Sequence, residues 1–502
     1  MGCFSLIRQQ DVSLVVALIV VMIGTLFFAR IHDSIGDQRM PSIMKDGGCR
    51  GYPLEDPAHG RHEDDFRNKF PSWVNMDNGI VSYGNTDRMR IFKKKLQAGE
   101  PVTVGVVGGS ISWGQGSSDR FKTSWVERFF DWIRTTFPHA NHTLVNGAVP
   151  ATPSAYMALC WRYYVPPNPD LMIVEYNVND GGDKSMNAPI RRAHERLLRS
   201  LLSLKSRPAV IQNVVMRIPE DNIPAPRYRN AGGDDELGVL AQYYHLPWIS
   251  TRSLMWDTMN HIEESQRVNY TEWMADRDHP NDLGHGLVAG MLIHLVETTP
   301  PYIFKKDLGS RGTHLPLPLY PNNFQVFNNT CILNEQFEKH VVASQGFQWA
   351  NDGTDSKPKY GFIGTQVGSH FQFAINTAEN IVNSPDGGTS SVSIAYLASY
   401  EHMGVFRVSC PTPSCACDPI VIDGHKEEHT SQLFTASMKV TKNESCILDF
   451  RIENITQSKE HKVRITGVIV SPDALDPSAN MYFAVENHLF DPIHHDTIKV
   501  YP

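Results

Sequence analysis

The chain has 502 residues, of which 41% are hydrophobic and 20% are charged. This length exceeds that of one ordinary domain, and the composition is typical of a globular protein with a large core, so we expect two domains. The formal net charge is -8, and no basic stripe interrupted by aromatic residues is present, which argues against nucleic acid as a partner.

Residues 12–29 form an unbroken stretch without a charged side chain. As a helix this stretch would be about 27 Å long, which is enough for a thin bilayer. No small-x-small cleavage site follows it, which disfavours a removable signal peptide. We therefore expect a short cytoplasmic tail at 1–11 and a transmembrane signal anchor at 12–29, with a buried core helix as the alternative.

Cysteines and glycosylation sequons indicate the compartment. Four of the cysteines after the predicted anchor fall between 410 and 446, and no His/Cys pair at zinc spacing accompanies them, so disulfides are favoured over a metal site. The odd number of cysteines after the anchor leaves one thiol free. We expect a single-pass type II membrane glycoprotein in the Golgi or another secretory-pathway lumen, with candidate glycosylation sites at Asn141, Asn269, Asn328, Asn443 and Asn454.

The region between the anchor and residue 300 is expected to have two parts. Residues 30–100 are polar with little periodicity, and we interpret them as a stem leading into the first domain. From Val102 onward, apolar runs typical of buried strands alternate with helical patterns. Strands are predicted at 102–107, 142–147, 170–177, 208–216 and 247–251, and helices at 124–137, 153–165, 188–204, 235–245 and 282–298.

This alternation predicts an α/β domain at 101–300, with a flavodoxin-like, three-layer parallel sheet covered by helices on both faces. In such sheets ligands bind outside the carboxyl ends of the strands. Ser110 follows the first predicted strand, Gly147 the second and Asn179 the third. We expect these three segments to meet at one edge of the sheet.

The turn after the first strand, Gly108-Gly109-Ser110, permits several interpretations. A phosphate-binding loop would need Lys and Ser/Thr after its last glycine, and a dinucleotide fingerprint would need G-x-G-x-x-G directly after the strand. This turn has neither pattern, so both interpretations are disfavoured. The nucleophile elbow of α/β-hydrolases needs a glycine two residues after the serine, where this chain has Ser112. A simple turn and an exposed catalytic serine remain.

A catalytic serine needs a base and a residue that orients the base. The segment "DRDHPNDLGH" (276–285) places Asp276 three residues before His279, so one turn can bring the carboxylate and the imidazole together. Asp278 is adjacent to the histidine and should point away, and His285 should lie inside the following helix in a packing role. The alternative is an exposed polar loop.

These segments together resemble the four sequence blocks of the SGNH (GDSL-like) hydrolases. "GGSISWG" (108–114) is similar to G-D-S-L-x-x-G, "VNGAVPATPS" (145–154) to the second block, "EYNVND" (175–180) to G-x-N-D, and "DRDH" (276–279) to D-x-x-H. Gly109 replaces the aspartate of the first block, and Asn177 replaces the glycine of the third.

The resemblance implies a role for each residue. Ser110 would be the nucleophile, His279 the general base and acid, and Asp276 the residue that holds the imidazole. The oxyanion hole would consist of the Ser110 N–H, the Gly147 N–H, with the Ala148 N–H as its rival, and the Asn179 side chain. No cofactor or metal is implied.

Residues 301–324 are rich in Pro and Gly and predict a linker, and short β-branched runs at 325–502 predict a β-sandwich-like domain. We expect a membrane-anchored serine esterase acting on O-acyl groups, most readily acetyl esters of a glycan. A polysaccharide O-acyltransferase with the same triad, a catalytically silent glycan-binding protein and an esterase acting on a lipid are the alternatives.

Overall fold

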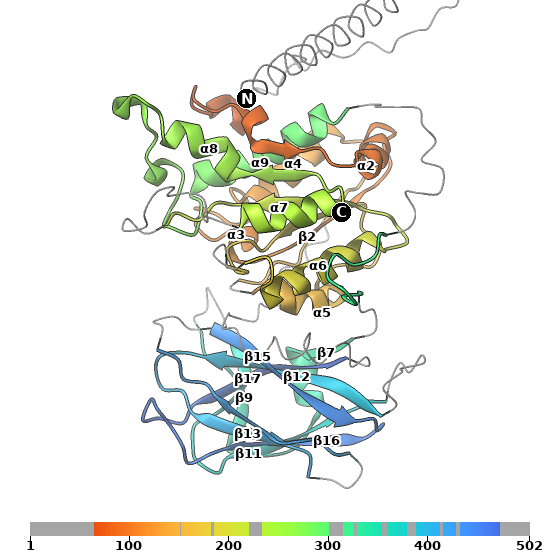
Figure 1. Ribbon diagram of the computed structural model, residues 1–502, viewed down its shortest axis with the longest axis vertical. Coiled ribbons are helices and arrows are strands. Elements are labelled where there is room, and N and C mark those ends of the chain that lie inside the picture. The colour runs from red at the N-terminus through yellow and green to blue at the C-terminus, as the bar shows by residue number, and fades with distance from the viewer. Residues whose placement is uncertain are drawn as a thin grey trace, which may run out of the picture. The chain divides into compact units, whose positions relative to one another are not determined.

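The structure is a computed structural model that describes residues 65–150, 152–181, 185–219, 233–300, 315–325, 329–353, 359–378, 388–411, 415–427 and 432–471 (Figure 1). The predicted cytoplasmic tail, membrane anchor and Asn328 lie outside these ranges. None of the helices within them combines the length and the apolar character that crossing a bilayer requires.

A six-stranded sheet forms the centre of the first domain, in the order β1-β6-β5-β4-β2-β3. Five of its strands are parallel: β2 (Thr103–Gly108), β3 (Thr143–Asn146), β4 (Leu171–Glu175), β5 (Ala209–Val214) and β6 (Trp248–Ser250). The edge strand β1 (Ile80–Ser82) is antiparallel to β6, so the sheet is mixed rather than purely parallel as predicted. Because β3 and β4 flank β2, the chain reverses its direction across the sheet there, which creates the crevice where such folds bind ligands.

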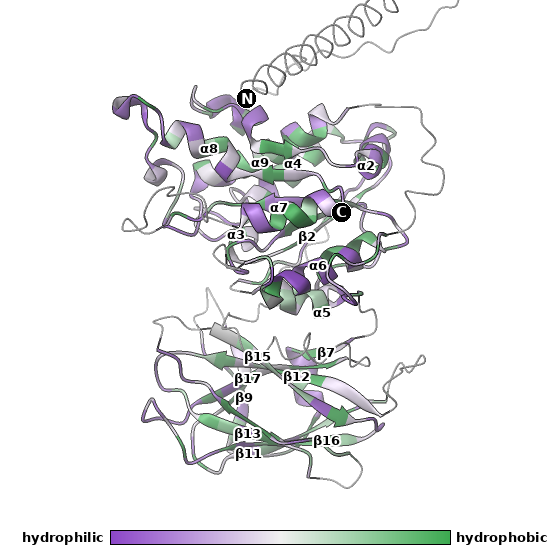
Figure 2. Ribbon diagram, in the orientation of Figure 1, coloured by the Kyte–Doolittle hydropathy of each residue, from purple (hydrophilic) through white to green (hydrophobic). Residues whose placement is uncertain are grey.

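Helices cover both faces of this sheet, as the alternation predicted. Alternate residues of β4 enter different cores: Leu171 and Ile173 pack on one face, and Met172 and Val174 on the other. Hydrophobic and hydrophilic residues are mixed along α6, as Figure 2 shows. The first face is covered by α2 (Asp87–Gln97), α4 (Trp125–Thr136), α8 (Thr251–Met259) and α9 (Asp282–Thr298), and the second by α5 (Ser154–Tyr164), α6 (Pro189–Leu202) and α7 (Asp234–Tyr243).

The described part of the predicted stem is a piece of this domain, which corrects that prediction. Residues 65–100 contain the short helices η1 (Phe66–Lys69) and η2 (Met76–Gly79), strand β1 and helix α2. Met89, Phe92 and Leu96 of α2 are buried in the core of the sheet's first face. Only these three positions of α2 are buried and the others are mostly charged, so its composition resembles that of a polar stem.

The second region consists of two antiparallel sheets that share one core. One sheet has the order β15-β12-β17-β10-β9, with β7 also paired to β17, and the other has the order β14-β13-β16-β11-β8. Their inner faces meet in a cluster of aromatic and aliphatic side chains around Phe337 of the short helix α10 (Glu335–Lys339). The strands are β7 (Thr330–Leu333), β8 (Val341–Gln345), β9 (Phe347–Asn351), β10 (Tyr360–Gly364), β11 (His370–Ile375), β12 (Thr389–Ala398), β13 (Val405–Ser409), β14 (Ile420–Asp423), β15 (Gln432–Thr441), β16 (Cys446–Ile452) and β17 (Val463–Ser471).

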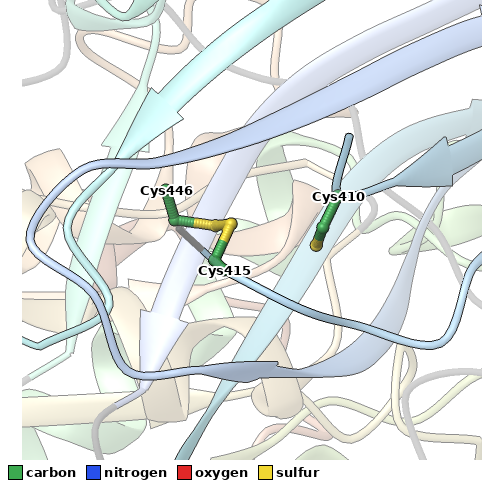
Figure 3. Close-up of side chains that lie close together, drawn as sticks. All are labelled: Cys410, Cys415 and Cys446. Carbon is green, nitrogen blue, oxygen red and sulfur yellow. A yellow bond between two sulfur atoms is a disulfide. The ribbon is translucent and has the colours of Figure 1, made fainter. Parts of the chain in front are cut away.

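Three disulfides confirm the prediction of disulfides and use every cysteine from Cys160 onward. They are Cys160–Cys331, Cys410–Cys417 and Cys415–Cys446. The sulfur atoms of Cys410, Cys415 and Cys446 lie within 4.8 Å of one another, but each belongs to a disulfide and none is a free thiolate that could bind a metal (Figure 3). The Cys160–Cys331 bond joins α5 to β7, so the α/β domain and the β region are covalently linked.

The described part of the predicted linker also has partners. The Glu195 side chain on α6 accepts hydrogen bonds from the Leu319 N–H (2.5 Å) and from the Asn323 amide (2.6 Å). Arg199, one turn later, donates to the Pro316 carbonyl (2.7 Å). Residues 315–325 therefore lie along α6 rather than forming a free connector.

Of the candidate glycosylation sites, Asn141, Asn269 and Asn454 are exposed and Asn443 is half-buried. Their modification remains a prediction.

Candidate active site

Ser110 lies at the carboxyl end of β2, at the first residue of the one-turn helix α3 (Ser110–Trp113). The two glycines before it are required by close packing. An added Cβ would lie 2.2 Å from the Ser112 Oγ at Gly108, and 1.9 Å from the Asn179 Oδ1 at Gly109. These glycines therefore let α3 and the loop after β4 approach each other directly behind Ser110.

The base predicted from the sequence lies beside this serine. The Ser110 Oγ is 2.9 Å from the His279 Nε2. On the other side of the ring, the His279 Nδ1 is 2.8 Å from the Asp276 Oδ2 and 3.0 Å from its Oδ1. The order hydroxyl, imidazole, carboxylate is the arrangement that lets a serine transfer its proton while the ring stays oriented.

The Asp276 carboxylate is also held by the backbone of its own turn. Its Oδ1 accepts the Asp278 N–H (2.7 Å) and the His279 N–H (2.8 Å). Burial acts to raise the pKa of Asp276, but the hydrogen bonds from the His279 ring and these two N–H groups outweigh burial and lower that pKa below its ordinary value. The carboxylate is therefore ionised at neutral pH, as a residue that stabilises an imidazolium must be.

Asp278 faces a different partner, as expected from its position. Its Oδ1 accepts a hydrogen bond of 2.7 Å from the Arg217 Nε, on the segment after β5. The carboxylate adjacent to the histidine in sequence is thus engaged in an exposed ion pair, and the one three residues away faces the ring.

The structure distinguishes the three predicted oxyanion donors. The Ser110 N–H stands at the first position of α3, where a helix leaves its amides without intrahelical partners. The Asn179 side chain is half-buried against the Cα of Gly109, and within the described ranges its amide nitrogen makes no hydrogen bond. Both groups are therefore available to a bound substrate.

The prediction for Gly147 is wrong in this conformation. The Gly147 N–H donates to the Val106 carbonyl (2.9 Å) as a continuation of the pairing between β3 and β2. Its rival, the Ala148 N–H, donates to the Asn146 side chain (3.1 Å). The sequence pattern could not reveal this, because strand pairing continues one residue beyond the polar Asn146 that marks the end of β3.

Two buried polar residues missed by the sequence analysis hold α3 in place. Glu175, the last residue of β4, accepts hydrogen bonds from the Ser112 hydroxyl (2.8 Å) and the Ser112 N–H (3.2 Å). Burial raises the pKa of Glu175 to about 8, although the bonds from Ser112 oppose this. Asn146 donates from its side chain to the Ser112 carbonyl (2.9 Å). The turn that carries Ser110 is therefore fixed from both neighbouring strands.

The loop after β4 is fixed in the same manner. Asn177 replaces the family's glycine. Its side-chain amide donates to the Val215 carbonyl (2.5 Å) and accepts from the Val215 N–H (3.1 Å), so it pairs with the backbone as a neighbouring strand would. Asp180 is buried and accepts from the Ser154 N–H (2.7 Å), and its other oxygen is 3.0 Å from the His194 Nδ1. These contacts hold the backbone on both sides of Asn179.

A third set of contacts ties the segment 114–124 to the start of α9. Asp282 accepts from the Ser118 N–H (2.8 Å) and the Thr123 hydroxyl (2.7 Å). His285 is buried in α9, accepts the Trp125 N–H at Nδ1 (3.2 Å) and donates from Nε2 to the Gln115 carbonyl (3.0 Å). Burial lowers the pKa of His285 to about 4, which keeps the ring neutral for both bonds. The packing role expected for His285 is thus observed.

Comparison with known proteins identifies the domain. Residues 106–287 match the family model described as the GDSL-like Lipase/Acylhydrolase family. This segment is an SGNH (GDSL-like) hydrolase domain. The matching family is one of lipases and acylhydrolases, which cleave ester bonds, and the chain is accordingly a carboxylic ester hydrolase. No curated protein sequence matches the chain.

Solved structures match over both regions. A two-domain esterase (CEX) active on acetylated mannans, co-crystallised with mannopentaose, is 20% identical with a TM-score of 0.58, covering 80% of this chain and 99% of that one. A second structure of a two-domain esterase (CEX) active on acetylated mannans is 21% identical with a TM-score of 0.57, covering 79% and 99%. At this identity the likeness establishes the fold: an SGNH domain followed by a β-rich region.

Proposed function

We propose that this chain is a serine esterase that removes O-acetyl groups from a glycan, with Ser110, His279 and Asp276 as its triad. The observation that carries the proposal is the chain of contacts from the Ser110 hydroxyl through the His279 ring to the Asp276 carboxylate, at the carboxyl edge of an SGNH domain. This arrangement has the groups and the order that ester hydrolysis requires.

In this mechanism the Ser110 Oγ attacks the acetyl carbonyl carbon while its proton passes to the His279 Nε2. The negative oxygen of the tetrahedral intermediate is stabilised by the Ser110 N–H and the Asn179 amide. The C–O bond to the sugar then breaks, and His279 returns the proton to the sugar oxygen. A water molecule, deprotonated by His279, attacks the acetyl-serine, and acetate leaves as Ser110 regains its proton.

The likeness to a two-domain esterase active on acetylated mannans supports a glycan as the molecule that carries the ester, because its fold covers most of this chain. Hydrolysis is preferred to transfer to a sugar acceptor, since both pathways share the acetyl-serine and water needs no acceptor site. The same triad could serve an acyltransferase, which the experiment below distinguishes.

The proposal includes a location. Three disulfides support an oxidising compartment. We place the chain as a type II membrane protein with its enzymatic part in the Golgi or another secretory lumen, held by residues 12–29. Endoglycosidase sensitivity of the full-length protein tests this topology, because the sequons after residue 30 are modified only if that part of the chain is lumenal.

The decisive assay measures acetate release by the full-length protein, purified from a secretory host in detergent. Substrates are a small aryl acetate and acetylated oligosaccharides derived from mannan, xylan and sialylated glycans, each with and without a sugar acceptor. The proposal predicts free acetate from the aryl ester and from at least one glycan. Acetyl groups recovered mainly on the acceptor would instead identify an acyltransferase. If Ser110→Ala kept both activities, Ser110 would not be the nucleophile.

A further inference from the structure

An exposed stack of side chains lies on the segment after α3. The Arg120 guanidinium carbon is 4.1 Å from the centre of the Trp113 ring and 4.2 Å from the centre of the Phe121 ring. The guanidinium therefore contacts two aromatic rings, and cation–π attraction to them restricts its movement. Phe121 is 44% exposed, and Trp113 and Arg120 are partly exposed.

This stack is close to the candidate nucleophile. Trp113 is three residues after Ser110 in α3, so one helical turn brings the two side chains to the same side of the helix. Gly114 has a φ of +101°, and a Cβ there would lie 2.9 Å from the Arg120 Cβ. The glycine thus reverses the chain and lets Arg120 return to the Trp113 ring.

The same segment passes directly beside the candidate base. At Gly116 an added Cβ would lie 2.1 Å from the Pro280 carbonyl oxygen and 3.1 Å from the His279 Cβ. Together with the contacts from Asp282 and His285, this fixes the segment between Ser110 and His279. An exposed aromatic ring and a cation are therefore presented on a firmly held part of the active-site rim.

We propose that Arg120 and Phe121 form a sugar-binding subsite, which holds the pyranose next to the one that carries the ester. The inference deepens the proposed function and rests on it. The apolar face of a pyranose packs on an aromatic ring, and the guanidinium, already held by Trp113, donates hydrogen bonds to sugar oxygens with little further loss of freedom. A small acetate ester carries no second sugar ring for these side chains to hold.

The test compares substrates rather than absolute activity. Full-length Arg120→Ala and Phe121→Ala are assayed on the small aryl acetate and on whichever acetylated oligosaccharide the unmodified enzyme cleaves fastest. The ratio of kcat/KM for the oligosaccharide to that for the aryl acetate should fall by about 10-fold in each variant, mainly through KM. Lys122→Ala is the matched control, because Lys122 lies in the same segment with a side chain that is 80% exposed, and its ratio should not change.

An unchanged ratio in both variants would overturn the subsite, as would an unmodified enzyme that cleaves the aryl acetate and none of the oligosaccharides. Failure of the proposed function is recognised separately, by full aryl acetate hydrolysis in Ser110→Ala. In that case calorimetric binding of the oligosaccharides to the Ser110→Ala protein still tests the subsite: loss of binding on adding Phe121→Ala supports it, and equal binding or no binding contradicts it.

Discussion

The Ser110 hydroxyl lies 2.9 Å from the His279 Nε2, although 169 positions separate the two residues in the chain. One follows β2 and the other precedes α9, and the sheet brings both segments to the carboxyl edge of its parallel strands. The contact is supported from behind, since Glu175 and Asn146 hold the turn of Ser110, and Asp276 holds the ring of His279.

The Asp276 carboxylate should be required for catalysis, and its neighbour should not. We expect Asp276→Asn to lower kcat on an aryl acetate by about 10³- to 10⁴-fold, because the amide no longer stabilises the imidazolium or its productive tautomer. Asp278→Asn is the matched control. It removes only an exposed ion pair with Arg217 and should change kcat less than about 3-fold. The reverse order of effects would assign the acid to Asp278.

Asn179 should act in the transition state. Asn179→Ala is expected to lower kcat by about 10²- to 10³-fold with little change in KM, because the amide meets the oxygen only once it carries negative charge. Steady-state kinetics on the aryl acetate measure this.

Asn177→Ala makes a useful contrast. It removes two hydrogen bonds that link the loop after β4 to Val215, so its main effect should be a lower unfolding temperature. If Asn179→Ala changed only the unfolding temperature and left kcat intact, Asn179 would be structural.

Glu175 should make the domain less stable as the pH rises. Burial raises its pKa to about 8 from an ordinary 4.5, so the folded protein holds a proton that the unfolded chain releases between these values. The contribution of this proton to the free energy of unfolding is fully present below about pH 4.5 and is lost as the pH rises through 8. The total loss is roughly 4–5 kcal/mol. Glu175→Gln, which stays neutral, should unfold at a higher temperature than the parent at pH 8.5 and at a similar one at pH 5.

Thermal unfolding across this pH range measures the effect of Glu175, and Glu264→Gln is the control. The side chain of Glu264 is 90% exposed, and its replacement should leave the pH dependence unchanged. Identical curves for Glu175→Gln and the parent protein would mean that Glu175 ionises freely in the folded state.

The disulfide that joins the two regions should stabilise the folded protein more than the disulfide that closes the short loop between Cys410 and Cys417. Cys160 and Cys331 are separated by 171 positions, and Cys410 and Cys417 by 7. In the chain-entropy description, closing these loops is worth about 5 and about 2 kcal/mol respectively. Replacing both cysteines of a pair by Ala should therefore lower the unfolding temperature further for Cys160/Cys331. A larger loss for Cys410/Cys417 would contradict this ranking.

The sequence predicts those features that depend on local patterns. Helix α9 begins and ends where expected, and its start is fixed by Asn281, which accepts hydrogen bonds from the Leu283 and Gly284 N–H groups. The buried strands were recognisable because both of their faces are covered, which leaves continuous apolar runs. Topology then brought Ser110, Asn179 and His279 to one edge.

What the sequence could not predict depends on tertiary contacts. Strand β1 and helix α2 resembled a stem, since only one narrow side of α2 is apolar. The hydrogen bond from the Gly147 N–H to the Val106 carbonyl depends on the register between β3 and β2. The contacts of Glu195 with residues 319–323 join segments far apart in sequence, and no local pattern indicates them.

The central claim, that Ser110 is a nucleophile activated by His279, is tested most directly by covalent labelling. The full-length protein is treated with a fluorophosphonate ester, digested and analysed by mass spectrometry, beside its Ser110→Ala and His279→Ala variants. We predict stoichiometric phosphonylation of Ser110 with parallel loss of esterase activity, at a rate at least about 10²-fold lower in His279→Ala. Inactivation by a label on another residue, or full esterase activity with Ser110 labelled, would contradict it.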